Sequence, residues 1–473
     1  MTASQQELRE FYVGKDVGDV PKPAIVLDAA IIKRHCEAML RTVKELNVGF
    51  RAHVKSHKTT EIAEMQVGVG DNSLGANFIA STVLEIETLV PLLRKLKTEE
   101  ARSVNVLYGI PLVPSQVAPL ARAALEIGAG RGTLAVMIDH PDQVDYLQQY
   151  FALTNSPASV FVKVDTGYHR AGLPPAALNK RGLLEKLANA EKLGYASLLG
   201  FYSHSSLSYA GTTPEEAMAH LTQEIEGCKE ALETHLELLP EKKELVISVG
   251  ATPQALSSQN LLPGGVSSPE ATALKNLLRN PLNQDRGVQV KIEIHAGVYP
   301  LLDMQQLSTH ARNGIRNPED EIAISVLAEV CSIYNDGERA KPEALLAAGT
   351  LALGREPCAG YPGWGVISSW RQSGGTSSSS SSSSSSRLIV ERISQEHSVV
   401  SWENPEHQPS LIPLRIGQTV KIYPNHACVA AAFYGFYFVV DSDQDPEAAR
   451  IVDVWVRARG SDITEPVLLP RVQ

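Results

Sequence analysis

A basic segment near the N-terminus carries the side chain best suited to covalent chemistry. Residues 50–55 read Phe-Arg-Ala-His-Val-Lys, and this alternation of apolar and basic side chains predicts a β-strand. At the carboxyl end of a barrel strand, Lys55 would project into the pocket where barrel enzymes perform chemistry. Neighbouring cations and burial would depress its pKa and favour a Schiff base. Lys58 is the rival, but we expect it in the following helix. A solvated surface lysine is the alternative interpretation.

A second candidate is the segment Pro-Asn-His-Ala-Cys at 424–428. If it is extended, His426 and Cys428 lie on the same face and can bind one ion. Imidazole nitrogen and thiolate sulfur favour Zn²⁺ over Mg²⁺ or Ca²⁺. Two protein ligands leave open positions for water or substrate, as in a catalytic Lewis acid. A buried cysteine beside a hydrogen-bonded histidine is the alternative.

Two glycine-containing turns follow predicted strands and could bind an anion. Gly250, Ala251 and Thr252 follow one strand, and Gly297 and Tyr299 follow the next. Backbone N–H groups and the Thr252 hydroxyl can donate to phosphate, which barrel enzymes often hold after strands seven and eight. A plain strand-to-helix turn is the alternative.

Other polar side chains gather at the ends of the fifth and sixth predicted strands. Arg170 is placed to donate to an oxyanion such as a phenolate or a carboxylate, or to form a surface salt bridge. Tyr202 and Tyr209 could donate hydrogen bonds or pack at the rim of the barrel. His53 lies on the polar face of the lysine strand, and contact between substrate and His53 or His57 stays open.

The elements that must position these side chains alternate between strand and helix. Eight strands are predicted at 50–55, 73–77, 104–108, 134–139, 160–165, 198–203, 245–249 and 288–295. Helices are predicted at 59–67, 82–96, 115–127, 141–151, 175–193 and 214–238. Eight such units are typical of a (β/α)8 TIM-type barrel. A doubly wound sheet is the alternative, but no glycine-rich dinucleotide fingerprint follows the first strand. A further strand at 24–27 precedes a helix that Asp28 would cap.

The pattern changes after about residue 315. Strands are predicted at 322–333, 388–394, 419–423, 429–440 and 451–456, with little helical periodicity. We therefore expect a barrel over 21–315, and an all-β domain over 1–20 and 316–473 that carries the metal pair. Residues 373–386 end in ten serines and predict a disordered insertion, with a phosphorylation tract as the alternative.

Composition narrows the class of protein. The 473 residues carry a formal net charge of −10, with 43% hydrophobic and 20% charged residues. A nucleic-acid surface is not expected, because phosphate binding requires a basic stripe. The five scattered cysteines (Cys36, Cys228, Cys331, Cys358 and Cys428) suit free thiols in a reducing compartment. No signal peptide or membrane span is apparent, so we expect a cytoplasmic protein.

Together these segments resemble the eukaryotic, zinc-dependent D-serine dehydratases. Those enzymes belong to the fold-type III pyridoxal phosphate group, which includes alanine racemase and D-threonine aldolase. The similar stretches are 51–58, 164–172, 200–204, 248–253, 393–397 and 424–428, within a resemblance that spans about 21–455. The resemblance implies an alanine racemase-like barrel and a homodimer in which the β domain of one chain caps the barrel of another.

The resemblance also implies roles for the candidate residues. It implies that Lys55 holds pyridoxal phosphate, with Arg170 near the ring phenolate and Tyr202 near the pyridine nitrogen. It further implies Zn²⁺ on His426 and Cys428. The remaining candidates for cofactor binding are His53, Tyr209, Gly250, Ala251, Thr252, Gly297 and Tyr299.

The implied reaction is β-elimination of D-serine to pyruvate and ammonia, in which zinc binds the substrate hydroxyl. D-Threonine aldolase and D-threo-3-hydroxyaspartate dehydratase are the nearest alternatives. The aldolases usually present an aspartate where this chain has Cys428. A non-catalytic regulatory protein that binds pyridoxal phosphate is an alternative from another class. This chain departs from the family at Ser206, where glycine is frequent, and in its serine-rich insertion.

Overall fold

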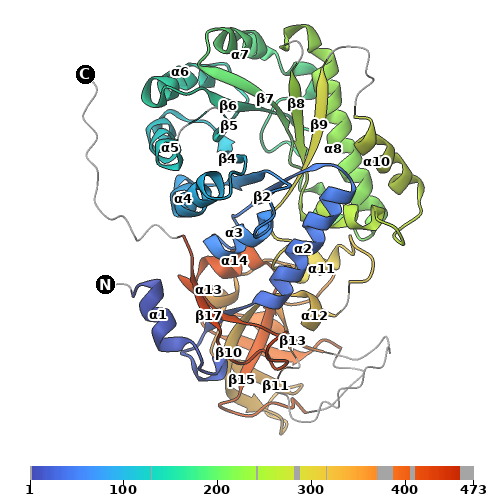
Figure 1. Cartoon of the computed structure of the whole chain (residues 1–473). Helices are drawn as coiled ribbons and strands as arrows, with labels where there is room; N and C mark the ends of the chain where they lie inside the picture. Colours follow the sequence, from blue (N-terminus) through green and yellow to red (C-terminus); the bar gives the residue numbers. More distant parts are fainter. Residues whose placement is uncertain are drawn as a thin grey trace.

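The computed structural model describes residues 3–128, 130, 132–240, 243–281, 288–315, 317–368, 370, 387–404 and 411–458. A barrel forms the upper part of the molecule in Figure 1, and a sheet domain forms the lower part. The insertion expected at 373–386 and the end of the predicted β domain after residue 458 lie outside the described residues.

The barrel consists of eight parallel strands, and β2 closes it by pairing with β9. The strands are β2 (Gly49–His53), β3 (Ala76–Ala80), β4 (Val104–Pro111), β5 (Leu134–Ile138), β6 (Ala158–Lys163), β7 (Ala196–Tyr202), β8 (Glu244–Val249) and β9 (Gln289–Ala296). Each strand pairs with its neighbour in the sequence, so the predicted barrel is confirmed.

Helices cover the outside of the barrel. They are α3 (Thr60–Val67), α4 (Val83–Thr98), α5 (Pro114–Ile127), α6 (Asp142–Thr154), α7 (Leu183–Lys192), α8 (Pro214–Thr234), α9 (Thr252–Ser258) and α10 (Pro269–Arg279). The helix predicted over 175–193 is wrong in its first half. Left-handed backbone at Arg181 and Gly182 separates short 3₁₀ turns from α7, because residues with positive φ cannot continue a right-handed helix.

The second part is a nine-stranded mixed sheet. Its strands are β1 (Ala24–Asp28), β10 (Ile324–Tyr334), β11 (Glu343–Leu346), β12 (Gly365–Ile367), β13 (Leu388–Ile393), β14 (Ser398–Trp402), β15 (Thr419–Pro424), β16 (Phe436–Val440) and β17 (Asp453–Val456). The short helices of this part are α1 (Gln5–Tyr12), α11 (Met304–Ser308), α12 (Pro318–Glu321), α13 (Thr350–Leu353) and α14 (Ala427–Ala432).

The placement of β1 differs from the expected domain boundary at residue 21. This strand pairs with β10 and β16 in the sheet domain, not with a barrel strand. The chain enters the barrel through α2 (Ala29–Glu45), which Asp28 caps as predicted by accepting from the backbone N–H groups of Ala30 and Ile31. Sequence periodicity identifies a strand but not its partner, and the partner here lies about 300 residues away.

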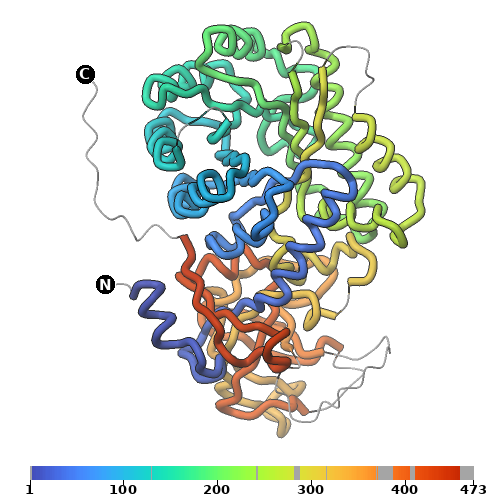
Figure 2. Tube along the Cα trace, viewed as in Figure 1, coloured from blue at the N-terminus to red at the C-terminus, as the bar shows by residue number. Residues whose placement is uncertain are grey.

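The two ends of the described chain meet on the sheet domain. Figure 2 shows the first helix (blue) beside the last strand (red). Arg9 on α1 lies 2.5 Å from Asp453 on β17, and Gln5 donates to the Val454 carbonyl at 3.0 Å. The predicted strand 429–440 is wrong in its first half, where the alanine-rich segment Ala427–Ala432 forms α14.

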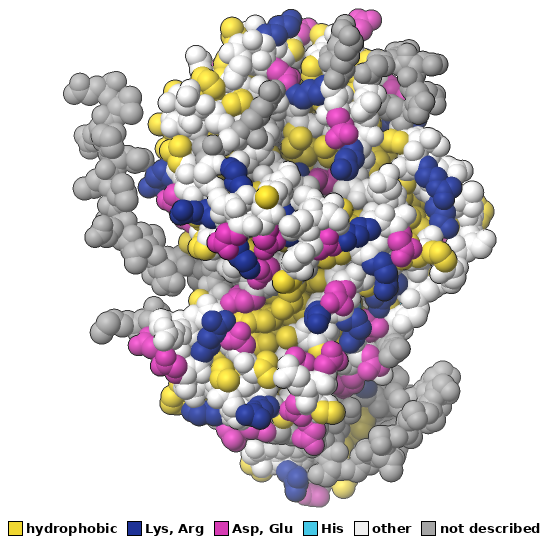
Figure 3. All heavy atoms as spheres, in the orientation of Figure 1, with side chains coloured by type: hydrophobic (Ala, Val, Ile, Leu, Met, Phe, Trp, Pro, Cys, Tyr) yellow, Lys and Arg dark blue, Asp and Glu magenta, His cyan; other side chains and the backbone are white. Residues whose placement is uncertain are grey.

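The surface carries both signs of charge. On the face drawn in Figure 3, basic and acidic side chains are interspersed, and hydrophobic side chains gather between the barrel and the sheet domain. Among the described helices, none combines the length and the apolar character needed to span a bilayer.

Candidate active site

A cavity of about 440 Å³ opens at the carboxyl ends of the barrel strands. It is lined by His53, Lys55, Ser81, Gly109, Ile110, Pro111, Met137, Lys163, Arg170, Ala171, Tyr202 and His204. The structure therefore brings together four of the predicted cofactor residues, namely His53, Lys55, Arg170 and Tyr202. They come from the ends of β2, β6 and β7, as the barrel topology requires.

Lys55 has the surroundings expected of the reactive lysine, and Lys58 does not. Lys55 follows β2, lines the cavity and is half-buried. Lys58 precedes α3 instead of lying in it, and its Nζ lies 2.7 Å from the buried Glu85 carboxylate. That ion pair occupies the Lys58 ammonium, which leaves Lys55 as the available amine of these two lysines.

Three neutral histidines lie in or beside the site: His53 and His204 line the cavity, and His295 packs against Tyr202 and His204. Burial lowers the pKa of His53, His204 and His295 well below the ordinary value, and nearby positive groups add to the effect. The His295 ring stacks on Tyr202 with ring centroids 4.4 Å apart, and its Nε2 lies 3.4 Å from His204 Nδ1. These rings supply hydrogen-bonding groups without positive charge. Roles for His204 and His295 are not predicted from the sequence, although His204 follows β7 and His295 lies near the end of β9.

A buried lysine and glutamate were also missed. Lys163, at the end of β6, has no hydrogen-bond partner for Nζ among the described residues, and Nζ lies 4.6 Å from the Tyr202 ring centroid. Glu224, on α8, accepts from the Gly250 N–H at 3.0 Å. Burial lowers the pKa of Lys163 and raises the pKa of Glu224, while each charge favours the other. Nothing in the apolar sequence of β6 signals a cavity-facing lysine.

The predicted phosphate loops border the cavity wall. Gly250 has a φ of 132°, and its carbonyl oxygen accepts a hydrogen bond from His204 Nδ1 at 2.7 Å. Thr252 begins α9, and its hydroxyl oxygen accepts from the Val298 N–H at 3.1 Å, joining the two predicted loops. The Gly250 N–H already donates to Glu224, so it is not free for phosphate. The phosphate role of Ala251, Thr252 and Gly297 stays a prediction.

Tyr299 and Tyr209, two of the predicted cofactor residues, are not among the residues that line the cavity. Tyr299 is fully buried and packs edge-on against Phe50 with centroids 5.6 Å apart. The Tyr299 side chain lies in the core beside Cys36 of α2, and it does not line the cavity. Burial raises its pKa, and the neighbouring Cys36 adds to this. Tyr209 lies in a 3₁₀ turn (Leu207–Ala210), where burial and the nearby Cys428 raise its pKa.

The metal pair differs in conformation from our expectation. His426 is extended but caps α14, and Cys428 lies in its first turn, so the two are not alternate residues of one strand. Burial raises the pKa of Cys428 to about 11, whereas the positive charges of Lys55 and Arg457 act to lower it. The charge of Lys55 therefore acts on the Cys428 thiol within one chain.

The donor set fits a zinc ion. His426 Nδ1 is buried without a hydrogen-bond partner in the described part of the chain, and the Glu356 carboxylate lies 3.9 Å away. No cluster of three or more His, Cys, Asp or Glu ligands occurs among the described residues. An imidazole and a thiol alone suit an open site better than a closed structural one.

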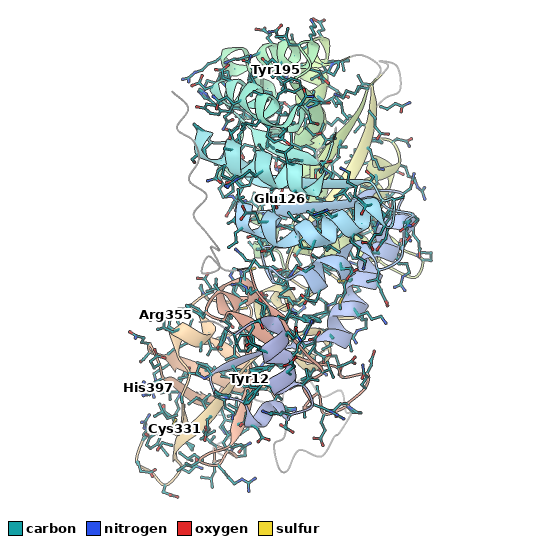
Figure 4. All side chains as sticks on the ribbon, turned by 60° about the vertical axis from the view of Figure 1, so that its left-hand side comes forward. Tyr12, Glu126, Tyr195, Cys331, Arg355 and His397 are labelled. Atoms are coloured by element: carbon teal, nitrogen blue, oxygen red, sulfur yellow. The ribbon has the colours of Figure 1, made fainter. Side chains whose placement is uncertain are left out.

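Cys428 is the cysteine that accompanies His426 at the candidate metal site. All five are free thiols, and Cys36 and Cys228 are buried in the core. Cys331 is exposed, and Figure 4 labels it in the lower domain, far from Tyr195 at the top of the barrel. Cys331 therefore offers a control for substitutions of Cys428.

Family models match both parts of the chain. Residues 27–262 match the model described as "Alanine racemase, N-terminal domain", and residues 323–440 match "Putative serine dehydratase domain". The barrel and its strand-end lysine thus define an alanine racemase-like protein with a second, dehydratase-type domain.

Relatives of known name give the family. The chain is 31% identical to the D-serine dehydratase of Schizosaccharomyces pombe over 97% of each chain. It is 26% identical to that of Saccharomyces cerevisiae over 94% of this chain and 97% of the yeast protein. The chain belongs to the D-serine dehydratase family. The solved D-threo-3-hydroxyaspartate dehydratase from Delftia sp. HT23 shares the fold, with a TM-score of 0.67, 22% identity and coverage of 94% and 99%.

Proposed function

We propose that this protein is a pyridoxal phosphate- and zinc-dependent D-serine dehydratase that converts D-serine to pyruvate and ammonia. The observation that carries the proposal is that Lys55, which lines the barrel cavity, acts electrostatically on the Cys428 thiol of the sheet domain. A β-elimination needs both an acceptor for the α-proton and a means to stabilise the departing hydroxyl. The two side chains can serve these two needs.

Lys55, His53, Arg170 and Tyr202 would hold the cofactor. Pyridoxal phosphate bound there would withdraw electrons from the α-carbon of an attached amino acid. The Lys55 amine would then accept the α-proton at Nζ. Arg170, whose guanidinium lines the cavity, would donate to an oxyanion at the mouth of the barrel.

His426 and Cys428 would hold the zinc ion. Zinc at this position would act as a Lewis acid toward the substrate hydroxyl. One relative of this fold is described as a cysteine-to-alanine mutant in the metal-free form, so metal binding is a property of that protein. The fit of the His426 and Cys428 donors extends the proposal to this chain.

The test is pyruvate formation from D-serine and from L-serine, with the metal removed by a chelator and then restored. We expect D-serine alone to react, and chelation to abolish the reaction until zinc returns. His426→Ala and Cys428→Ala should retain the cofactor absorbance but lose turnover, whereas Cys331→Ala should behave as wild type. Full activity in the chelated protein would overturn the metal role.

Two related activities use the same parts. D-Threo-3-hydroxyaspartate dehydratase of Delftia is 24% identical, and D-threonine aldolase of Arthrobacter is 22% identical. Oxaloacetate from D-threo-3-hydroxyaspartate would favour the first, and glycine with acetaldehyde from D-threonine would favour the second. We also propose a cytoplasmic homodimer, which sedimentation of the purified chain and cell fractionation would test.

A further inference from the structure

One buried carboxylate caps two helices at the junction of the domains. Asp303 is fully buried. Its Oδ1 accepts from the Gln306 N–H at 2.8 Å, which caps α11. Its Oδ2 accepts from the Ala427 N–H at 2.7 Å, the first residue of α14. Because Ala427 lies between the two candidate zinc ligands, this bond fixes the backbone that carries both of them.

Gln305, the second residue of α11, forms another hydrogen bond to the same segment. The Gln305 N–H donates to the Asn425 carbonyl at 3.1 Å. The Asn425 side-chain amide in turn donates to the carbonyls of Glu356 at 3.0 Å and Gly363 at 2.9 Å. Residues 425–427 are therefore held on one side by α11 and on another by the loop before β12.

Asp303 is also joined to the predicted cofactor loop by a short, ordered turn. The N–H groups of Leu301 and Leu302 both donate to the Val298 carbonyl at 2.9 Å, and the Val298 N–H donates to Thr252. Hydrogen bonds thus link the turn that precedes Asp303 to Thr252 in the predicted cofactor loop.

The charge of Asp303 has no ion-pair partner in the part of the chain that the structure describes. A buried carboxylate is costly unless hydrogen bonds or a cation compensate it. Backbone N–H groups supply part of that compensation. His426 also acts on the carboxylate electrostatically, and a cation bound at His426 would add to this compensation.

We propose that Asp303 is a positioning residue that fixes His426 and Cys428 in the geometry that binds zinc beside Lys55. The inference rests on the proposed zinc site. Asparagine at position 303 would place a side-chain N–H donor opposite a backbone N–H donor. Alanine at position 303 would remove the caps of both α11 and α14. Outer-shell partners of metal ligands typically contribute about 10- to 100-fold to metal affinity.

The experiment measures zinc affinity in the cofactor-loaded full chain by competition with a chromophoric chelator. We expect Asp303→Asn and Asp303→Ala to bind zinc about 10- to 100-fold more weakly than wild type, with the cofactor absorbance at Lys55 unchanged. Cobalt in place of zinc should show an altered d–d spectrum in Asp303→Asn, which reports ligand geometry independently of turnover.

The matched control is Asp28→Ala. Asp28 is also a buried aspartate that caps a helix, and it accepts from the Ala30 N–H at 3.0 Å, but it lies in the sheet domain on β1. Asp28→Ala should lower the melting temperature without changing zinc affinity. Wild-type zinc affinity in folded Asp303→Asn, or equal losses in Asp303→Ala and Asp28→Ala, would overturn the inference. A wild-type protein that binds zinc tightly but makes no pyruvate would instead overturn only the proposed function.

Discussion

Arg51 and Glu293 form a bidentate ion pair inside the barrel. Arg51 Nε lies 2.6 Å from Glu293 Oε1, and Arg51 Nη2 lies 3.2 Å from Glu293 Oε2. Arg51 is 2% exposed. It also donates to Asn105 at 2.5 Å, and its guanidinium lies 5.3 Å from the Phe161 ring centroid. Although Arg51 shares the polar face of the lysine strand, it lies below the cavity and links β2 to β9.

Removing one partner of this pair should strongly destabilise the barrel. Arg51→Met leaves the Glu293 charge buried, and we expect a loss of about 3–5 kcal/mol in the free energy of unfolding, measured by urea denaturation. Lys186→Met, which removes the exposed pair with Asp145, should cost less than about 1 kcal/mol. The double change Arg51→Met with Glu293→Met should recover part of the loss. Equal effects of the two single variants would contradict a buried pair.

Substitutions of the two lysines in the 50–58 segment should have different effects on cofactor absorbance and on stability. Lys55→Ala should abolish the visible absorbance of lysine-bound cofactor, because no other amine in the cavity lies at the end of β2. Lys58→Ala should retain that absorbance and lose stability, because it leaves the Glu85 carboxylate buried without its ammonium. Spectra and thermal melts of both purified variants make the comparison. Retained absorbance in Lys55→Ala would transfer the role to Lys163, the other lysine that lines the cavity.

Local pattern was sufficient to predict the barrel and part of its site. Alternating strands and helices predicted all eight barrel strands, because each pairs with its neighbour in the sequence. The same local order placed Lys55, Arg170 and Tyr202 at strand ends, where they meet in the cavity. The sheet domain was harder. β1 and β10 pair across about 300 residues, and no periodicity encodes that partner.

The errors in predicting the site at Tyr299 and Lys163 have a different cause. Tyr299 was predicted to bind cofactor, but a turn residue gives no sign of which side its ring faces, and it packs on Phe50. Lys163 was missed because its neighbours on β6 are apolar. The orientation of both depends on how the barrel strands tilt and stagger, which is a property of the closed sheet.

Acid should destabilise the native state partly through His57. This side chain is fully buried, its Nε2 lies 3.0 Å from Gln66 Oε1, and its Nδ1 accepts from the Thr59 N–H at 3.1 Å. Burial, together with the positive charge of Arg457, lowers the pKa of His57 to about 3. The unfolded chain binds this proton near pH 6.5, so the stability contributed by neutral His57 is present above about pH 6.5 and is lost as pH falls toward 3.

The size of this effect can be measured by difference. Between about pH 6.5 and 4.5, wild type should lose about 2 to 3 kcal/mol more than His57→Gln, because glutamine does not titrate. Urea denaturation at the two pH values gives both losses. His169→Gln, at an exposed histidine, should follow wild type. Parallel losses in wild type and His57→Gln would show that another group is responsible.

The turn after β8 should tolerate no side chain at Gly250. A Cβ there would lie 2.7 Å from the His295 carbonyl oxygen, and the φ of 132° is a conformation that only glycine adopts readily. We expect Gly250→Ala to displace the turn from His204 and Glu224, and therefore to weaken cofactor binding at least tenfold. Gly264→Ala is the matched control, since Gly264 also has a positive φ (83°) but a Cβ there meets nothing within 4 Å. It should cost only about 1–2 kcal/mol of stability and leave the cofactor affinity unchanged. Cofactor titration and urea denaturation of both variants test this, and equal cofactor affinity in the two would remove the Gly250 turn from the site.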